Sequence, residues 1–195
     1  MTRQHIILAV LWIVFSVFHS VFAGERWKNG MRLLMKTNYK FYRICYSIFA
    51  LITLIIVLAY HFSLETIFLW RVGAVEKIVG IICMISGAAV MLLFTRKFFF
   101  DLSGADVFRK KQTSQQLIKT GLYKSVRHPL YAATLVFVWG IFLWQPLLNN
   151  LVSCICISVY SIIGIRFEEK KLINEFGDSY LEYSSRTPML FPRLF

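Results

Sequence analysis

The stretch SVRHPLYAATLVFVWGIFLWQPLLNNLVSCICISVYSIIGIRFEEK, residues 125–170, contains two apolar runs with a polar break between them. The runs cover residues 129–144 and 147–166. The break holds residues that favour a turn, namely Gln145, Pro146, Asn149 and Asn150. A turn between two apolar runs predicts a hairpin of two rather short helices. Charged and ionisable residues stand at its open end, where a membrane disfavours them unless they have partners or a function.

Three further apolar segments precede this hairpin, at residues 4–23, 42–61 and 75–95. Each is long enough to cross a bilayer, because a spanning helix needs about 20 residues. The chain is 57% hydrophobic and only 16% charged, with a mean hydropathy of +0.61, which excludes an ordinary soluble domain. The sequence therefore predicts an all-α integral membrane protein with about five transmembrane helices and a cytosolic, helical C-terminal segment.

The first apolar segment has the wrong flanks for a secretory signal peptide. Only Arg3 precedes it, whereas a group of basic residues follows it. A signal peptide has the opposite arrangement. We therefore expect a single membrane domain over residues 1–195, with three N-terminal spans in residues 1–95, a cytosolic loop at 96–128 and the hairpin and tail at 129–195.

The basic residues predict the orientation of these spans. The net charge is +12, and 19 of the 22 Lys and Arg residues fall in two loops and the tail, which five spans place on one face. The positive-inside rule makes that face cytoplasmic. The N-terminus is then outside, and the C-terminus and the candidate site are cytoplasmic. The partner implied is the lipid bilayer and not nucleic acid, because the basic residues flank apolar segments and accompany no nucleic-acid-binding motif. Nothing in the sequence indicates an oligomeric state.

The four cysteines lie inside apolar runs, without the spacing of a metal site. They are expected to be buried small apolar side chains, and no metal is predicted.

The start of the fourth apolar run is the first candidate site. Pro129 suits the first turn of a helix, which places Arg127 and His128 at its N-terminal end and Tyr131 on its first turn. Backbone N–H groups, the helix dipole and a guanidinium together favour an anion such as a carboxylate. The alternative is that these side chains are only interfacial anchors and part of an aromatic belt.

Glu168 and Glu169 directly follow the fifth apolar run. The hairpin brings them back beside Arg127 and His128, which makes a site with both signs of charge, suited to a zwitterionic ligand with a cationic centre. Their adjacency means that only one of the two glutamates need face the site. The alternative is a pair of solvated carboxylates matched with neighbouring lysines. Residues 172–183 predict an amphipathic helix interrupted near Gly177.

Several of these pieces, in this order and spacing, resemble the isoprenylcysteine carboxyl methyltransferase family, which belongs to a wider group with phospholipid N-methyltransferases. The matching residues lie between about 118 and 192: Thr120-Gly121-Leu122-Tyr123, Arg127-His128-Pro129-x-Tyr131, Glu168-Glu169, Phe176-Gly177-x-x-Tyr180-x-x-Tyr183 and the segment from Pro188 to Pro192. Residues 18–28 and 39–47 look like the front of bacterial relatives that include methanethiol S-methyltransferases.

This resemblance implies S-adenosylmethionine as the cofactor, bound without a Rossmann domain. It assigns cofactor binding to Leu122, Tyr123, His128, Tyr131, Glu168 and Glu169. It gives Arg127 and Glu168 catalytic roles, Arg127 by holding the anionic end of the substrate.

The resemblance makes an isoprenylcysteine-type carboxylate the first candidate acceptor, with a small thiol or a phospholipid amine as alternatives. Besides Arg127, the residue predicted to contact a lipophilic acceptor is His19, a polar residue in the first apolar segment. Two other readings of the sequence stay open. Sterol reductases share a similar C-terminal half, but they have more spans. The second alternative is a non-enzymatic membrane scaffold or carrier.

Overall fold

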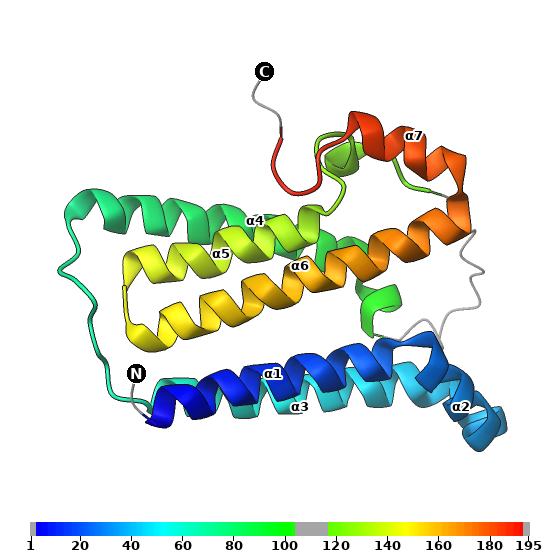
Figure 1. Ribbon diagram of the computed structural model, residues 1–195, viewed down its shortest axis with the longest axis horizontal. Helices are drawn as coiled ribbons and strands as arrows, with labels where there is room; N and C mark the ends of the chain where they lie inside the picture. The colour runs from blue at the N-terminus through cyan, green and yellow to red at the C-terminus, as the bar shows by residue number, and fades with distance from the viewer. Residues whose placement is uncertain (1–2, 104–116, 193–195) are drawn as a thin grey trace. The chain divides into compact units, whose positions relative to one another are not determined.

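The structure, a computed structural model, describes residues 3–103 and 117–192 and is helical almost throughout these ranges (Figure 1). The α-helices are α1 (Arg3–Ala23), α2 (Glu25–Met35), α3 (Tyr42–Ser63), α4 (Ala74–Ser103), α5 (Pro129–Trp144), α6 (Leu148–Phe176) and α7 (Asp178–Arg186). Two 3-10 helices, η1 (Lys36–Phe41) and η3 (Gly121–Lys124), join them. The described residues form no strand, so the predicted all-α membrane fold is confirmed.

All five predicted apolar segments are helical, but they differ in length. Four helical stretches are long and apolar enough to cross a membrane, at Arg3–Ala23, Glu25–Ser63, Ala74–Arg96 and Leu148–Phe176. Helix α5 has 16 residues, which falls short of the usual spanning length of about 20. The structure therefore supports four spans by length and composition, and a fifth span through α5 stays a prediction. Within the predicted loop at 96–128, α4 extends to Ser103 and Gly121–Lys124 form η3, while residues 104–116 lie outside the described residues.

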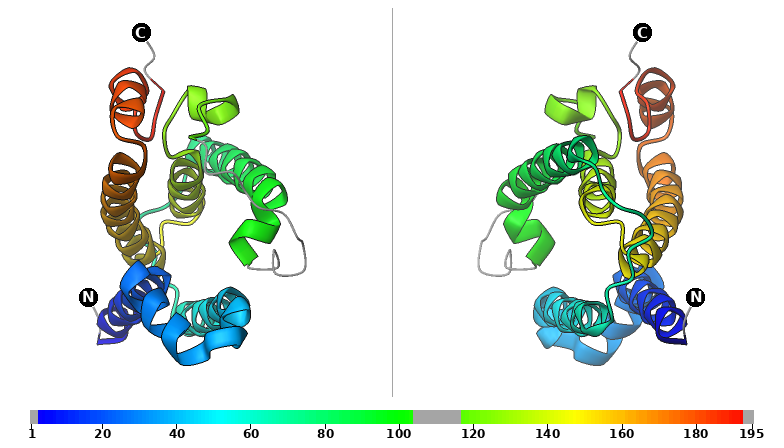
Figure 2. Two further views of the ribbon diagram at one scale, coloured as in Figure 1. Left: turned by 90° about the vertical axis from the view of Figure 1, so that its right-hand side faces the viewer. Right: turned by 90° about the vertical axis from the view of Figure 1, so that its left-hand side faces the viewer.

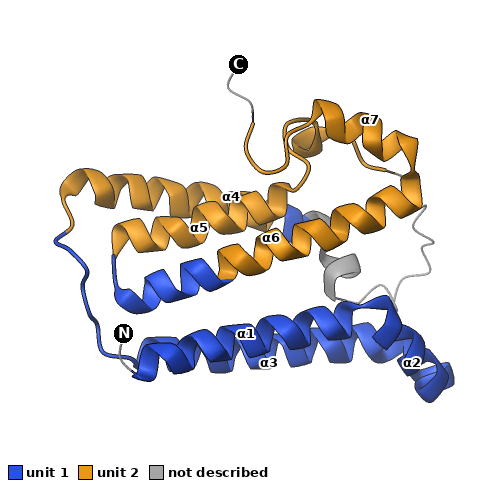
Figure 3. Cartoon of the chain, viewed as in Figure 1, with its two compact units in different colours: residues 1–71, 94–112, 146–156 blue, residues 72–93, 113–145, 157–195 orange. Residues whose placement is uncertain are grey.

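The chain divides into two compact units (Figure 3). Unit 1 contains residues 1–71, 94–112 and 146–156, and unit 2 contains residues 72–93, 113–145 and 157–195. The division passes through α6, whose first turns belong to unit 1 and whose remainder belongs to unit 2.

In unit 1, α1 and α3 run antiparallel and side by side, as Figures 1 and 2 both show. At one end the Tyr46 hydroxyl lies 3.0 Å from Nδ1 of His19. At the other end the Tyr60 hydroxyl donates to the carbonyl of Gln4 over 3.2 Å. Residues 24–41, which include α2 and η1, join the end of α1 to the start of α3, and these two ends are adjacent.

A buried polar cluster in unit 1 corrects the predicted turn. His61 Nδ1 lies 2.9 Å from Ser153 Oγ, and its Nε2 lies 3.1 Å from Asn150 Oδ1. Asn149 Nδ2 donates to the His61 carbonyl over 3.2 Å. The two asparagines were expected in the turn but are helical, because their side chains form hydrogen bonds with His61 inside the apolar unit. The break between α5 and α6 is residues 145–147.

In unit 2, glycines allow α4 and α5 to approach closely. A Cβ added at Gly80 would lie 2.7 Å from the Trp144 nitrogen and 2.8 Å from the Gly140 carbonyl oxygen. A Cβ at Gly87 would lie 2.7 Å from the Ala133 carbonyl oxygen. Small residues at a helix contact let backbones pack tightly where lipid gives no hydrophobic drive for association.

We expect Gly80→Ala to destabilise unit 2 by about 1–3 kcal/mol, because the added methyl meets α5 backbone that cannot move aside without shifting a helix. Thermal unfolding of the purified protein in detergent measures this loss. Gly30→Ala is the matched control, since a Cβ at Gly30 has nothing within 4 Å. A helical glycine replaced by alanine without a clash should keep or raise the melting temperature. Equal stability of both variants would contradict the close packing of α4 on α5.

Helices α5 and α6 run antiparallel within unit 2. Trp139 Nε1 donates to Ser158 Oγ over 3.0 Å, and one to two turns further a Cβ on Gly164 would lie 3.2 Å from the Tyr131 hydroxyl. Helix α6 continues ten residues beyond the predicted end of its apolar run and carries both glutamates. It stops at Gly177, whose φ of +52° favours glycine, and this confirms the predicted interruption.

Candidate functional site

The segment before α5 is fixed by the end of the chain. Pro129 is the first residue of α5, where its missing N–H is not needed. The amide of Arg127 donates to the Pro188 carbonyl over 2.9 Å, and the amide of His128 donates to the Met189 carbonyl over 3.1 Å. We call residues 187–192 the C-terminal strap. Pairing with the strap positions two consecutive functional side chains at the end of α5.

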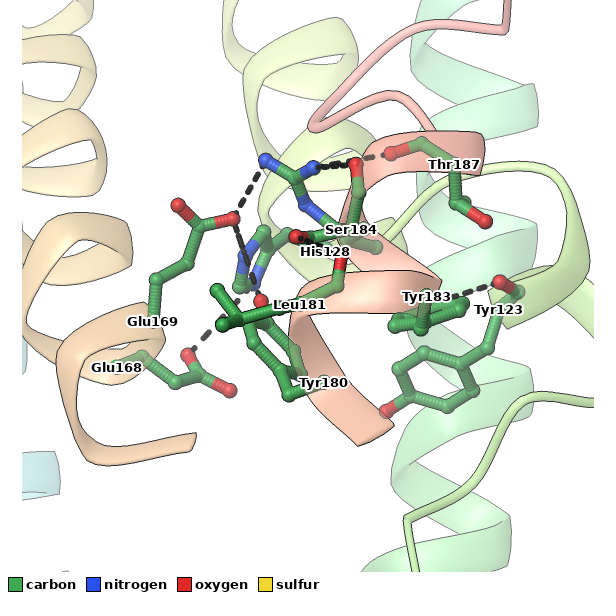
Figure 4. Close-up of polar contacts among 10 residues, drawn as sticks. Tyr123, His128, Glu168, Glu169, Tyr180, Leu181, Tyr183, Ser184 and Thr187 are labelled. Atoms are coloured by element: carbon green, nitrogen blue, oxygen red, sulfur yellow. Dashed lines mark hydrogen bonds and ion pairs between the residues drawn. The ribbon is translucent and has the colours of Figure 1, made fainter. Parts of the chain in front are cut away.

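One carboxylate oxygen organises the site (Figure 4). Glu169 Oε1 lies 2.7 Å from Arg127 Nη2 and 3.2 Å from His128 Nε2. It also accepts a hydrogen bond of 3.3 Å from the Tyr180 hydroxyl of α7. The side chains of Arg127 and Glu169 are 14% and 22% exposed, so this is a largely buried ion pair that depends on its hydrogen bonds.

His128 lies between the two glutamates. Its side chain is 2% exposed, and its Nδ1 is 3.9 Å from Glu168 Oε2, too far for a hydrogen bond. Its ring meets the ring of Tyr131 edge-on, with centroids 5.9 Å apart. The Tyr131 hydroxyl in turn donates to the Glu168 carboxylate. Both glutamates therefore contribute to the site, although adjacency in sequence required only one.

Arg127 also holds α7 and the strap. Its Nη1 donates to the carbonyls of Ser184 and Thr187, over 2.6 and 3.0 Å. Its Nε is buried and has no hydrogen-bond partner. A second tie joins α7 to η3, where the Tyr183 hydroxyl donates to the Tyr123 carbonyl over 2.6 Å. The site thus contains a buried donor without a partner, the Nε of Arg127, and a carboxylate, that of Glu168, which is 46% exposed.

The electrostatics keep two phenols protonated. Burial raises the pKa of Tyr180, and the carboxylate of Glu169 raises it further against the opposing effect of Arg127. Burial likewise raises the pKa of Tyr123, and Glu168 adds to the shift. Both hydroxyls therefore remain hydrogen-bond donors at neutral pH, so the site holds more donors than the two basic side chains alone.

The structure brings most of the predicted site residues together in unit 2, namely Arg127, His128, Tyr131, Glu168 and Glu169. Tyr123 adjoins them, because its carbonyl accepts a hydrogen bond from Tyr183 and its side chain interacts electrostatically with Glu168.

Two predicted residues lie elsewhere. Leu122 lines a mainly apolar cavity of about 360 Å³ formed by α4, α5 and the strap. His19 belongs to unit 1, where it contacts Tyr46. A contact between either residue and a ligand stays a prediction.

Sequence reasoning assigned no role to four residues that complete the site: Tyr180, Tyr183, Ser184 and Thr187. The tyrosines carried a usable signal, because the spacing of Tyr180 and Tyr183 places both on one side of a helical turn. The other two act through backbone carbonyls, which any residue type supplies. Among the described residues, no group of three His, Cys, Asp or Glu side chains could hold a metal ion.

Comparison with known proteins finds a family match that covers Arg127, His128, Glu168 and Glu169. Residues 75–179 match the family described as phospholipid methyltransferase. Methanethiol S-methyltransferase 1 of Bradyrhizobium diazoefficiens is 30% identical over 96% of this chain and 66% of its own length. Methanethiol S-methyltransferase of Pseudomonas deceptionensis is 27% identical over 95% of this chain and 71% of its own.

A third relative, protein-S-isoprenylcysteine O-methyltransferase of Saccharomyces cerevisiae, is 33% identical over 57% of this chain and 49% of its own length. The chain thus spans less than two thirds of the length of several curated relatives that it matches, down to 38% for a second Bradyrhizobium methanethiol S-methyltransferase. No solved structure matches the chain significantly.

Proposed function

Because the chain belongs to the phospholipid methyltransferase family, we propose that it is a membrane methyltransferase that uses S-adenosylmethionine. The observation that carries this proposal is the cluster around Glu169, with Arg127 and His128 on one side and the exposed carboxylate of Glu168 on the other. A cluster with both signs of charge suits a zwitterion that also carries a cationic sulfonium.

The polar atoms of the cluster fit this cofactor. The buried Nε of Arg127 lacks an acceptor, and a carboxylate oxygen supplies one. Glu168 offers a half-exposed acceptor to an amino group or a ribose hydroxyl. We propose that these two residues, with His128, Tyr131 and Glu169, bind S-adenosylmethionine, which when bound supplies an electrophilic methyl group.

In this proposal the chain's own residues bind, orient and exclude water. Arg127 is already tied to three oxygens, and Nε is its one nitrogen without a partner, so it does not offer a free fork. The strap and α7 cover the side chains of Arg127 and His128, which keeps the reacting groups in a water-poor site. Positioning of donor and nucleophile about 3–3.5 Å apart then provides most of the acceleration, because the acceptor brings its own lone pair.

A small thiol is the acceptor that we favour, since the relatives matching more than nine tenths of this chain are named for methanethiol. A simple alkanethiol is a weaker acid than a cysteine thiol, whose pKa is about 8.5, so it is mostly protonated at neutral pH. His128, held by Glu169, is the residue placed to accept its proton. An isoprenylcysteine-type carboxylate is the second candidate, favoured by a relative named for it that matches 57% of this chain. A carboxylate needs no base.

We place the site on the cytoplasmic face, with the N-terminus outside, because the basic residues concentrate beside it.

Radiolabelled S-adenosylmethionine tests the function directly. The purified full chain in lipid nanodiscs is expected to bind it with micromolar affinity and to transfer label to methanethiol or a short alkanethiol faster than to an S-farnesylcysteine analogue. His128→Ala should lower transfer to the thiol at pH 7 more than at pH 9, because a larger fraction of the thiol is ionised without a base at the higher pH. Transfer to the carboxylate alone would select the second candidate, and no binding at millimolar cofactor would overturn the proposal.

A further inference from the structure

Residues 25–41, which comprise α2 and η1 and which we call the interfacial segment, connect the ends of two antiparallel apolar helices in unit 1. The Tyr42 hydroxyl at the start of α3 donates to the Phe22 carbonyl at the end of α1 over 2.6 Å, so these ends are adjacent. A segment that joins adjacent ends of two spanning helices lies at a membrane surface. It folds back at Lys36, whose φ of +47° separates α2 from η1.

Helix α2 is amphipathic and exposes its apolar side. Trp27, Met31 and Leu34 follow the spacing of one helix face, whereas Lys28 and Arg32 lie on another. Trp27 is 43% exposed and Leu34 is 76% exposed. The protein leaves these apolar side chains uncovered at the membrane surface. They become buried when α2 lies in the plane of the bilayer surface with its apolar face against the acyl chains.

The polar side of the segment is strongly basic. Five Lys and Arg residues accompany a single acid, Glu25. That acid pairs with Lys28 over 3.2 Å. The remaining positive charge stands on exposed side chains, including those of Lys36 and Lys40. The Arg32 guanidinium lies 5.1 Å from the centroid of the Tyr39 ring, which holds the two halves of the segment together.

We propose that the interfacial segment is an in-plane anchor that binds anionic phospholipid headgroups. The apolar face of α2 sits at the boundary of the acyl chains, and the exposed lysines contact phosphate groups of the same leaflet. Charge complementarity selects anionic over zwitterionic lipids, since each basic residue near an anionic surface strengthens binding about fivefold. This surface lies outside the proposed methyltransferase site and does not depend on it.

Photo-crosslinking locates the segment. A photoreactive phenylalanine analogue placed at Leu34 of the full chain in nanodiscs is expected to crosslink to phospholipid. The same analogue at Asn29, on the opposite face of α2, should crosslink poorly and serves as the matched control. Crosslinking of position 34 to a second copy of the chain, or equal lipid crosslinking at both positions, would overturn the proposal.

Lipid selectivity tests the headgroup contact. Wild-type protein in discs of phosphatidylcholine with 30% phosphatidylglycerol is expected to retain phosphatidylglycerol preferentially through detergent extraction, as measured by native mass spectrometry. Lys36→Gln with Lys40→Gln should reduce this preference about tenfold or more. Arg71→Gln with Lys77→Gln removes the same charge from the loop before α4 and the first turn of α4, and should change the preference little. An unchanged preference in the first variant would overturn the proposal, whether or not the chain transfers methyl groups.

Discussion

Glu169→Ala is expected to weaken S-adenosylmethionine binding by about 100-fold or more. The change removes the oxygen that Arg127, His128 and Tyr180 share, at 2.7, 3.2 and 3.3 Å. Removing one partner of a buried ion pair costs about 3–5 kcal/mol, because the other charge stays buried without compensation. Three side chains, two from the segment before α5 and one from α7, lose their common acceptor at once, so the loss exceeds that of a single hydrogen bond.

The measurement is equilibrium binding of labelled cofactor to the purified protein, accompanied by a melting curve. Glu169→Gln keeps the shape and removes the charge, so it separates electrostatics from packing. Glu182→Ala is the matched control. The Glu182 side chain is 61% exposed, and its ion pair within α7 is with Arg186, one helical turn away. Cofactor affinity within threefold of wild type in Glu169→Ala would show that the cluster is structural and that the cofactor site lies elsewhere.

The arrangement of this cluster followed from the sequence to a considerable extent. Two apolar runs with a proline-containing break predicted the hairpin, and a hairpin necessarily brings the residues before α5 beside those at the end of α6. The ion pair of Arg127 with Glu169 is the consequence. The predicted interruption at Gly177 also holds, since a backbone with φ of +52° suits glycine.

The contributions of α7 and the strap could not be predicted in the same way. Ser184, Thr187, Pro188 and Met189 act through main-chain carbonyls, and a carbonyl leaves no trace in residue type. The two asparagines misplaced in the turn show a related limit. Their polar character favours a turn when only neighbours in sequence are considered, but both side chains form hydrogen bonds from inside a helix with His61, almost 90 residues away.

The role of Arg127 also differs from what the sequence indicated. A guanidinium before a helix N-terminus suggested an open donor for an anionic substrate. The structure instead directs both Nη atoms to groups of the protein and leaves only Nε without a partner. Arg127 therefore joins α6, α7 and the strap, and its effect on any substrate includes this positioning.

Arg127→Ala is accordingly expected to loosen α7 and the strap while the hairpin stays folded. Hydrogen bonds to charged groups contribute about 1.5–3 kcal/mol each, and two of them hold the carbonyls of Ser184 and Thr187. Hydrogen–deuterium exchange of peptides covering residues 178–192 should therefore speed up by about 100-fold or more. Amides in the middle of α5 should exchange as in the wild type, because their hydrogen bonds lie within the helix.

Arg186→Ala is the matched control for this experiment. Arg186 also lies in α7 and forms an ion pair, with Glu182 at 3.1 Å, but its side chain is 78% exposed. An exposed pair contributes about 0–1 kcal/mol, so exchange of the same peptides should hardly change. Arg127→Lys should fall between the two, because one ammonium cannot reach three oxygens in the planar fork that the guanidinium provides. If Arg127→Ala leaves exchange in α7 and the strap unchanged, Arg127 does not hold them, and its importance must come from contact with a ligand instead.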